Sequence, residues 1–150
     1  MTTTHSAHTM SHQIQQTLGF HLFQTTMRLK AAFARILRPY DITPEQFTLL
    51  SLLSDTDGLQ QREIAELLFK DRPNVTRILE KLEKKELVLR KKDSVDRRAS
   101  RVHITVSGRE RYTLLNEAAE SFRSQAYHGL EPTDKNRLKA SLNQIMENLS

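Results

Sequence analysis

The sequence predicts a mainly α-helical fold that carries a single β-hairpin. Gly and Pro number only four each among 150 residues, too few for the many tight turns of a β-sandwich. Apolar residues recur at helical spacing along most of the chain, whereas strict apolar–polar alternation is confined to residues 101–106, which follow a second short segment at 87–91. With 37% hydrophobic residues, the chain suffices for one ordinary domain, alone or with a dimerisation appendage.

The composition excludes several classes of protein. The chain contains no cysteine, so disulfides, thiolate metal sites and cysteine redox switches are excluded. It has no apolar run of about 18 residues that would span a membrane, and its polar N-terminus lacks an apolar leader core, so we expect a cytoplasmic location. We identify no nucleophile paired with a base, no Gly-rich phosphate loop and no paired carboxylates, so we expect no catalytic residues and no cofactor.

The N-terminal residues 1–11 are rich in Thr, His and Ser and are expected to form a flexible tail. His5, His8 and His12 have no carboxylate or Cys partner nearby, so a solvated tail is favoured over a metal site, and no metal site is predicted.

Residues 12–38 predict a long helix with two apolar strips. One strip contains Ile14, Leu18, Leu22, Leu29, Phe33 and Ile36, and the other contains Phe20, Phe23 and Met27. Two strips suit a helix that packs on its own domain with one face and on a second subunit with the other. The alternative is that both strips serve one intramolecular core.

Three shorter helices are expected next. Pro39 ends the long helix, and Thr43, Pro44 and Gln46 form the cap of a second one. After a turn at 55–58, residues 59–68 predict a short helix, and Asp71 caps the helix that follows. The apolar stripe of that last helix, formed by Val75, Ile78, Leu79 and Leu82, leaves a polar, cationic outer face.

Positive charge is concentrated between residues 70 and 101. This segment holds twelve basic and six acidic residues, a net of +6, whereas the whole chain carries +5. The loop at 92–100 has no Gly for a tight turn, so an extended, exposed tip is expected. A helix pair followed by a hairpin with a basic tip predicts a winged helix-turn-helix lobe that binds DNA, a polyanion.

The C-terminal third predicts two further helices. Ser107 and Glu110 are spaced as a capping box, and Thr133 is expected to cap the last helix after a break at Gly129 and Pro132. Together with residues 12–38, residues 107–150 are expected to form a helical dimerisation layer around a DNA-binding lobe at 39–106. A helical hairpin folded back on its own domain would show the same pattern.

These elements, in this order, resemble the MarR family of winged-helix transcription regulators over nearly the whole chain. The similarity is carried by DRPNVTR at 71–77, LEKKELV at 82–88, DRR at 96–98, VHIT at 102–105 and SGR at 107–109. The family usually has Gly where this chain has Glu86, so we expect the end of that helix to be shaped differently.

The resemblance implies a homodimer that binds double-stranded DNA at a pseudo-palindromic operator, with recognition helices in successive major grooves and wings in the flanking minor grooves. It assigns base reading to Arg77 and minor-groove insertion to Arg98, which Asp96 would orient. Arg pairs bidentately with guanine, and a narrow A·T-rich minor groove attracts guanidinium, so the chemistry agrees. Further base contacts are expected from Pro73, Asn74 and Thr76, and phosphate contacts from Arg72, Lys81, Lys91 and Arg97.

The resemblance also implies a repressor that is released by a small aromatic or phenolic effector, bound between the DNA lobe and the dimer layer. The candidate effector contacts are Phe20, His21, Phe23, Met27, Arg28 and Tyr112, although core packing explains the apolar members equally well. The alternative function is an architectural, nucleoid-type DNA-binding protein with little sequence preference.

Overall fold

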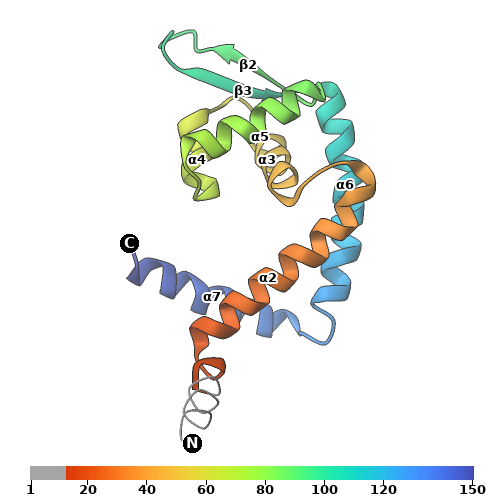
Figure 1. Cartoon of the computed structure of the whole chain (residues 1–150), viewed down its shortest axis with the longest axis vertical. Coiled ribbons are helices and arrows are strands. Elements are labelled where there is room, and N and C mark those ends of the chain that lie inside the picture. The colour runs from red at the N-terminus through yellow and green to blue at the C-terminus, as the bar shows by residue number, and fades with distance from the viewer. Residues whose placement is uncertain (1–12) are drawn as a thin grey trace, which may run out of the picture.

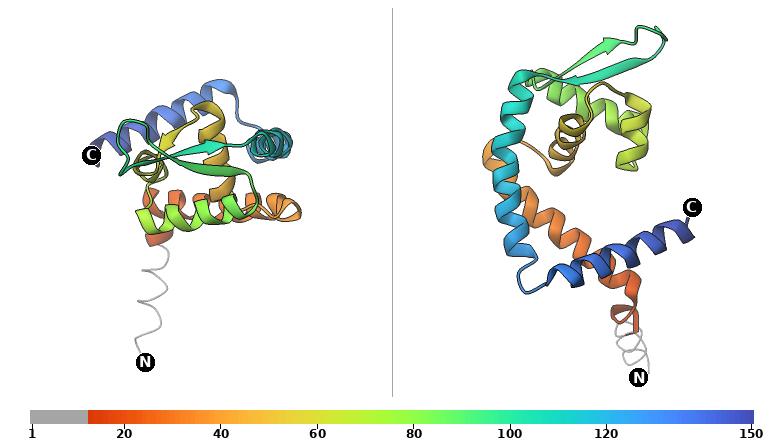
Figure 2. Two further views of the ribbon diagram at one scale, coloured as in Figure 1. Left: turned by 90° about the horizontal axis from the view of Figure 1, so that it is seen from above. Right: turned by 180° about the vertical axis from the view of Figure 1, so that it is seen from behind.

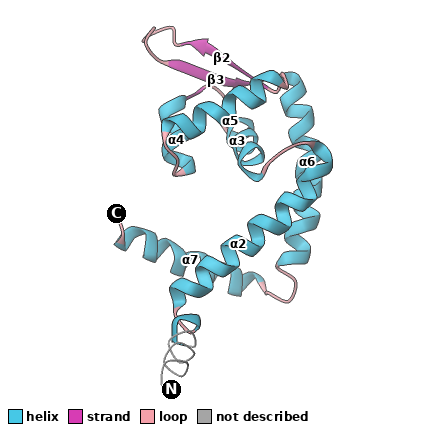
Figure 3. Ribbon diagram, in the orientation of Figure 1, coloured by secondary structure: helices cyan, strands magenta, loops and turns pink. Residues whose placement is uncertain are grey.

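The fold is mostly helical and contains a small three-stranded antiparallel sheet, as the sequence predicts (Figures 1 and 3). The structure, a computed structural model, describes residues 13–150. Its elements are α2 (Leu18–Leu37), η1 (a 3-10 turn, Arg38–Tyr40), α3 (Pro44–Asp55), β1 (Leu59–Gln60), α4 (Gln61–Leu68), α5 (Arg72–Lys84), β2 (Val88–Lys92), β3 (Ser100–Ile104), α6 (Val106–Ala126) and α7 (Pro132–Asn148).

The molecule has two parts, which we call the head and the base. The head consists of α3, α4, α5 and the sheet. The base consists of α2, α7 and the C-terminal half of α6. The whole helix α6 runs from the head to the base (Figure 1). In Figure 1, α7 crosses α2, but the view from above in Figure 2 places these two helices on opposite sides of the molecule. The two base helices therefore do not form a packed pair within one chain.

The sheet has the strand order β1-β3-β2. The hairpin pairs Val88 with Ile104 at one end and Lys92 with Ser100 at the other. The third strand, β1, is an addition to the predicted hairpin, because residues 59–60 were expected to belong to a helix. Two residues are too short for any alternation of side chains to show in a sequence.

Most of the hydrophobic core lies in the head, and Leu37 of α2 with Leu115 and Ala119 of α6 completes it. Every fully buried apolar residue of the described chain falls between Leu37 and Ala119. Within residues 13–150, α7 has no buried residue and α2 has only Leu37. The apolar strips predicted for the base helices are thus mostly uncovered by their own chain.

An aromatic cluster joins the base to the head. The ring of Phe33 on α2 lies 5.2 Å from those of Phe47 on α3 and Phe122 on α6, measured between centroids. The ring of Tyr112 on α6 lies 5.8 Å from that of Phe47. These contacts place the end of α2 against the head.

Two predicted helix starts are confirmed. The Thr43 hydroxyl accepts the N–H of Gln46 at 3.2 Å while the Gln46 side chain accepts the N–H of Thr43 at 3.1 Å. Asp71 caps α5 by accepting the N–H of Asn74 at 2.8 Å. Each side chain satisfies a donor that the first helical turn would leave unpaired.

One predicted helix is interrupted and two predicted starts are wrong. Residues 13–15 are helical, but a break at 16–17 separates them from α2, which begins at Leu18 behind the cap residue Thr17. Thr105, and not Ser107, caps α6, so Val106 belongs to this helix and is 76% exposed. Glu131, and not Thr133, caps α7. Thr105 stands before the predicted cap of α6, and its hydroxyl accepts the N–H of Gly108 at 2.9 Å. Glu131 stands before the predicted cap of α7, and its backbone N–H is accepted by Asp134 at 3.0 Å.

The connection between α5 and the hairpin keeps the backbone conformation that Gly favours. Glu86 has φ of 59°, in the left-handed region. The expectation of a differently shaped helix end is therefore wrong. The backbone of Glu86 adopts the left-handed conformation that Gly would adopt, and in a residue with a side chain this conformation is strained. The N–H of Leu87 still reaches the carbonyl of Leu82 at 3.0 Å, which closes the helix end.

Candidate DNA-binding surface

The first two turns of α5 hold a chain of polar contacts along one face. Asp71 accepts hydrogen bonds from the backbone N–H of Asn74 and, at 2.9 Å, from its side-chain amide. The amide oxygen of Asn74 in turn accepts a hydrogen bond from the guanidinium of Arg77. Asp71, Asn74 and Arg77 are spaced three residues apart, so each lies beside the next on the helix surface. The exposed Arg77 is thereby held in a defined orientation.

The other predicted contacts on α5 differ in exposure. Arg72, Pro73 and Lys81 are exposed, while Asn74 and Thr76 are half-buried. The hydroxyl of Thr76 accepts a hydrogen bond from the Gln61 amide of α4 at 2.5 Å. This bond joins α4 to α5 through Thr76.

The wing tip presents two exposed arginines, Arg97 and Arg98. Asp96 accepts the backbone N–H of Arg98 at 3.0 Å, so it orders the tip backbone and leaves the guanidinium free. Within residues 13–150, neither Arg97 nor Arg98 makes a side-chain hydrogen bond or ion pair. Lys91, on β2, is also exposed.

Three of the twelve cations counted in the sequence are neutralised by the protein itself. Arg90 forms a bidentate pair with Glu83, at 2.9 and 2.7 Å, which raises the pKa of Arg90. Lys85 pairs with Asp41, and Arg101 pairs with Asp93 at 2.7 Å. Nothing in residue spacing reveals these pairs, because their members come from different elements.

The turn between α3 and β1 is attached to the sheet by Asp57. Its carboxylate accepts the backbone N–H of Ile104 at 2.8 Å and lies 3.4 Å from Nδ1 of His103. Burial alone would raise the pKa of Asp57, but the hydrogen bonds from Ile104 and His103 outweigh it and hold the pKa below its usual value. His103 is half-buried.

The six predicted effector contacts do not converge in one chain. Phe23 and Met27 are 62% and 53% exposed on α2. Tyr112 packs on Phe47 in the aromatic cluster, and its hydroxyl lies 3.4 Å from that of Ser51. Phe20 is half-buried, His21 is exposed, and the Nδ1 of His21 bonds to the Thr17 carbonyl at 2.9 Å.

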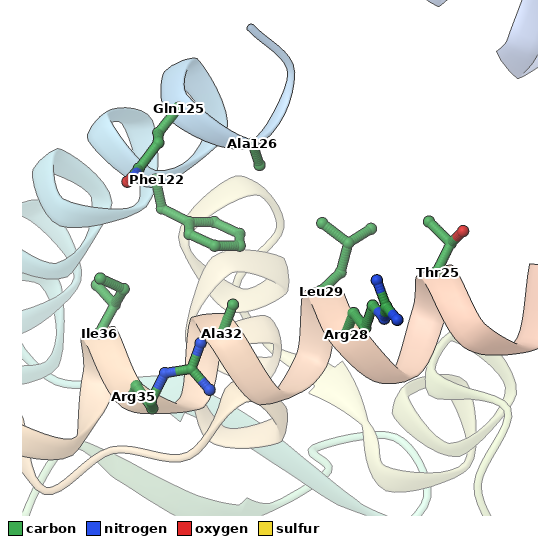
Figure 4. Close-up of a pocket in the computed structure, with 9 residues that line it drawn as sticks. All are labelled: Thr25, Arg28, Leu29, Ala32, Arg35, Ile36, Phe122, Gln125 and Ala126. Atoms are coloured by element: carbon green, nitrogen blue, oxygen red, sulfur yellow. The ribbon is translucent and has the colours of Figure 1, made fainter.

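A groove of about 470 Å³ does lie between α2 and α6, and Arg28 is the one predicted effector residue that lines it. Figure 4 shows the Phe122 ring pointing from α6 toward α2, with Leu29 and Ala32 on the facing side. Arg28 and Arg35 bring two guanidinium groups to the same groove.

Residues 13–150 contain neither a membrane-spanning helix nor a metal-binding cluster. No helix in this range is both long and apolar enough to cross a membrane. No group of three or more His, Cys, Asp or Glu side chains in it is arranged to hold a metal ion. His5, His8 and His12 lie outside the described residues, as does the predicted tail.

The helix pair α4 and α5 with the β2–β3 wing defines a winged helix-turn-helix protein of the DNA-binding class. The sequence profile of the MarR family matches residues 42–100, the segment that forms most of the head. The regulator FarR of Neisseria gonorrhoeae is 31% identical over 103 residues, which cover 69% of this chain and 70% of FarR. The chain belongs to the MarR family of helix-turn-helix transcription regulators. It is therefore a DNA-binding regulator, and its relatives are not enzymes.

Further comparisons agree with this assignment. A putative transcriptional regulatory protein for the hcr operon of Thauera aromatica is 28% identical over 102 residues, which span 67% of this chain and 61% of that protein. A structure of the repressor CouR bound to a 23-mer DNA duplex is 27% identical and has a TM-score of 0.83, covering 89% of this chain and 95% of CouR. CouR from Rhodococcus jostii RHA1 bound to p-coumaroyl-CoA aligns at 22% identity with a TM-score of 0.81, over 88% and 93% of the two chains.

Proposed function

We propose that this protein is a homodimeric repressor that binds a pseudo-palindromic operator and is released from it by a small-molecule effector. One observation carries the proposal: the head holds most of the core and the exposed arginines Arg77, Arg97 and Arg98, whereas most of the exposed large apolar side chains lie in the base. In this division, residues 39–106 bind DNA, and residues 12–38 and 107–150 dimerise.

The apolar surface of the base supports the homodimer. Its exposed large apolar residues include Leu18, Phe23, Met27, Ile36, Tyr127, Leu130, Leu138, Met146 and Leu149. Exposed apolar surface on this scale is typical of a protein–protein interface. We infer that a second copy of the chain covers this surface. Two identical heads related by twofold symmetry would bind the two half-sites of an inverted repeat.

The free cations of the head support operator binding. Arg77 emerges from the N-terminal half of α5, the part of a recognition helix that contacts base edges in a major groove. Arg98 emerges from the wing tip, which suits a minor groove. Arg72, Lys81, Lys91 and Arg97 are exposed around them and suit phosphate contacts, and Pro73 and Asn74 border Arg77.

Repression is tested by in vitro transcription from the promoter upstream of the gene that encodes this chain. We expect added protein to lower the transcript level and to protect a paired site in a footprint of the same DNA. A raised transcript level with the same footprint would make the protein an activator. Equal protection of unrelated duplexes would favour the architectural alternative.

The groove between α2 and α6 supports the effector part of the proposal. Its apolar walls suit an aromatic ring, and Arg28 suits a carboxylate or phenolate. We expect 4-hydroxybenzoate or a larger phenolic acid to lower the fluorescence anisotropy of labelled operator DNA mixed with the protein. The Arg28→Ala variant should respond less. An anisotropy that no phenolic acid changes would contradict this part.

A further inference from the structure

A buried carboxylate lies at the root of the wing. Asp93 directly follows the last residue of β2, where the paired strands open into the tip loop. It is only 5% exposed, although the sequence places it in a loop that we expected to be exposed throughout. An acidic side chain is rarely buried unless it is paired, so its partners are informative.

Asp93 is bonded to three separate segments. Its Oδ2 accepts hydrogen bonds from Nε of Arg101 on β3, at 2.7 Å, and from the side-chain amide of Gln60 on β1, at 3.2 Å. Its Oδ1 accepts the backbone N–H of Val95 in the tip loop, at 2.9 Å. The N–H of Val95 and the guanidinium of Arg101 hold the pKa of Asp93 below its usual value, so the carboxylate stays ionised.

Arg101 extends this network to the turn before β1. Its Nη1 donates to the carbonyl of Gly58 at 2.7 Å, while its Nε donates to Asp93. Gly58 has φ of 76°, a left-handed conformation that aims this carbonyl and suits Gly. Arg101 has two donors bonded to protein acceptors, whereas Arg97 and Arg98 make no side-chain hydrogen bond to any part of the chain that the structure describes.

The same network continues into the helix-turn-helix. Gln60, which touches Asp93, also caps α4 through its backbone N–H, which donates to Glu63 at 2.6 Å. The next residue, Gln61, donates to Thr76 on α5. The wing root is thus linked to the recognition helix by two side-chain hydrogen bonds, from Gln60 to Asp93 and from Gln61 to Thr76, whose donors are consecutive residues of the chain.

We propose that Asp93 and Arg101 are positioning residues for DNA binding, which fix the angle of the wing relative to α5. Arg97 and Arg98 then reach the DNA backbone and minor groove at a set distance from Arg77. Arg101 acts through the protein and not as a phosphate contact. The inference rests on the proposed operator binding and names residues that the family resemblance did not assign.

The sharpest test is Asp93→Asn, because simple electrostatics and the proposal predict opposite results. Removing a negative charge from a DNA-binding head should strengthen binding if Asp93 is merely a nearby charge. The proposal predicts operator affinity about tenfold weaker, the scale of one lost base-edge contact. It also predicts that hydroxyl-radical protection of the flanking minor grooves is lost while protection of the central major grooves remains, which shows that the head is still folded.

Two further variants complete the test. Glu80→Gln removes a negative charge from an exposed position on α5 and should bind as tightly as the parent chain or more tightly. Arg101→Lys keeps the charge but loses the fork that bridges Asp93 and Gly58, so it should lose the flanking protection as Asp93→Asn does.

The outcomes separate this inference from the proposed function. If the parent chain protects no specific site, the proposed function fails. If the parent chain and Glu80→Gln protect a site and either Asp93→Asn or Arg101→Lys keeps full affinity and full flanking protection, the positioning role is overturned.

Discussion

At the scale of single residues, the guanidinium of Arg77 is the side chain on which sequence reading depends. It is exposed, and Asn74 holds it in line with Asp71. Part of the conformational entropy that this side chain would lose on binding DNA is therefore already lost in the free protein, which favours tight and selective contact. A flexible arginine at the same place would supply charge without this selectivity.

Arg77→Ala should lose about 1–3 kcal/mol of operator affinity, roughly 10- to 100-fold, and relax specificity at one base pair of each half-site. Arg137→Ala, which removes the same charge from the exposed surface of α7, is the control and should change affinity little. Gel-shift titrations at one salt concentration measure both. Equal affinities for the two variants would remove Arg77 from the site.

Glu86 is a second residue with a measurable consequence. Its left-handed backbone costs about 1 kcal/mol in a residue other than Gly. Glu86→Gly should therefore raise the free energy of unfolding by up to about 1 kcal/mol. Glu80→Gly, in the right-handed interior of the same helix, should lower it by about 1 kcal/mol. Urea denaturation of both variants checks the opposite signs, and a loss of stability in Glu86→Gly would refute the strain.

At the scale of elements, the N-terminus of α6 is fixed by its close contact with the residue that leads into the hairpin. A Cβ added to Gly108 would lie 2.1 Å from the carbonyl oxygen of Leu87. Thr105 caps this helix and also donates to the carbonyl of Glu86 at 2.7 Å. The helix that leads to the base is thus seated on the head by backbone contact.

Gly108→Ala should lower the free energy of unfolding by about 1–3 kcal/mol or more, because a backbone carbonyl cannot move aside as a side chain can. Gly19→Ala is the matched control, since nothing lies within 4 Å of the added methyl group in the described structure. Alanine favours helix over glycine by up to about 1 kcal/mol, so this control should be slightly more stable. Thermal denaturation by circular dichroism distinguishes them, and similar melting temperatures would contradict the close contact.

The elements show what the sequence can and cannot reveal. Periodicity and caps predict the helices, the hairpin and the start of α5, because those signals are local. The strand β1 and the pairing of Asp93 with Arg101 were missed, because both depend on contacts between distant segments. The cap residues Thr105 and Glu131 were missed because two nearby residues competed for the same role.

At the scale of the whole molecule, the head provides the folded core, and the base provides the surface through which we propose that two chains assemble. The core of the head is complete within one chain, whereas α7 has no buried residue within residues 13–150. A second copy that covers the base would fix the distance between two heads, and that distance selects the spacing of the DNA half-sites.

Leu138→Glu should shift the protein from two chains toward one chain of 17.4 kDa and weaken operator binding, because a charge would enter the apolar interface. Leu138 is 52% exposed on α7, and Leu67, 55% exposed on α4 of the head, provides the matched control Leu67→Glu. Sedimentation velocity measures the mass. A dimer in both variants, or a monomeric parent chain, would contradict assembly through the base.

The most direct test of the central claim, that two heads read one paired site, is selection of binding sequences from a random pool of DNA duplexes with the full chain. We predict an enriched inverted repeat whose half-site centres lie about one helical turn, roughly 10 base pairs, apart. A pool that stays random through selection, with similar affinity for unrelated duplexes at matched salt, would contradict the claim and identify an architectural DNA-binding protein instead.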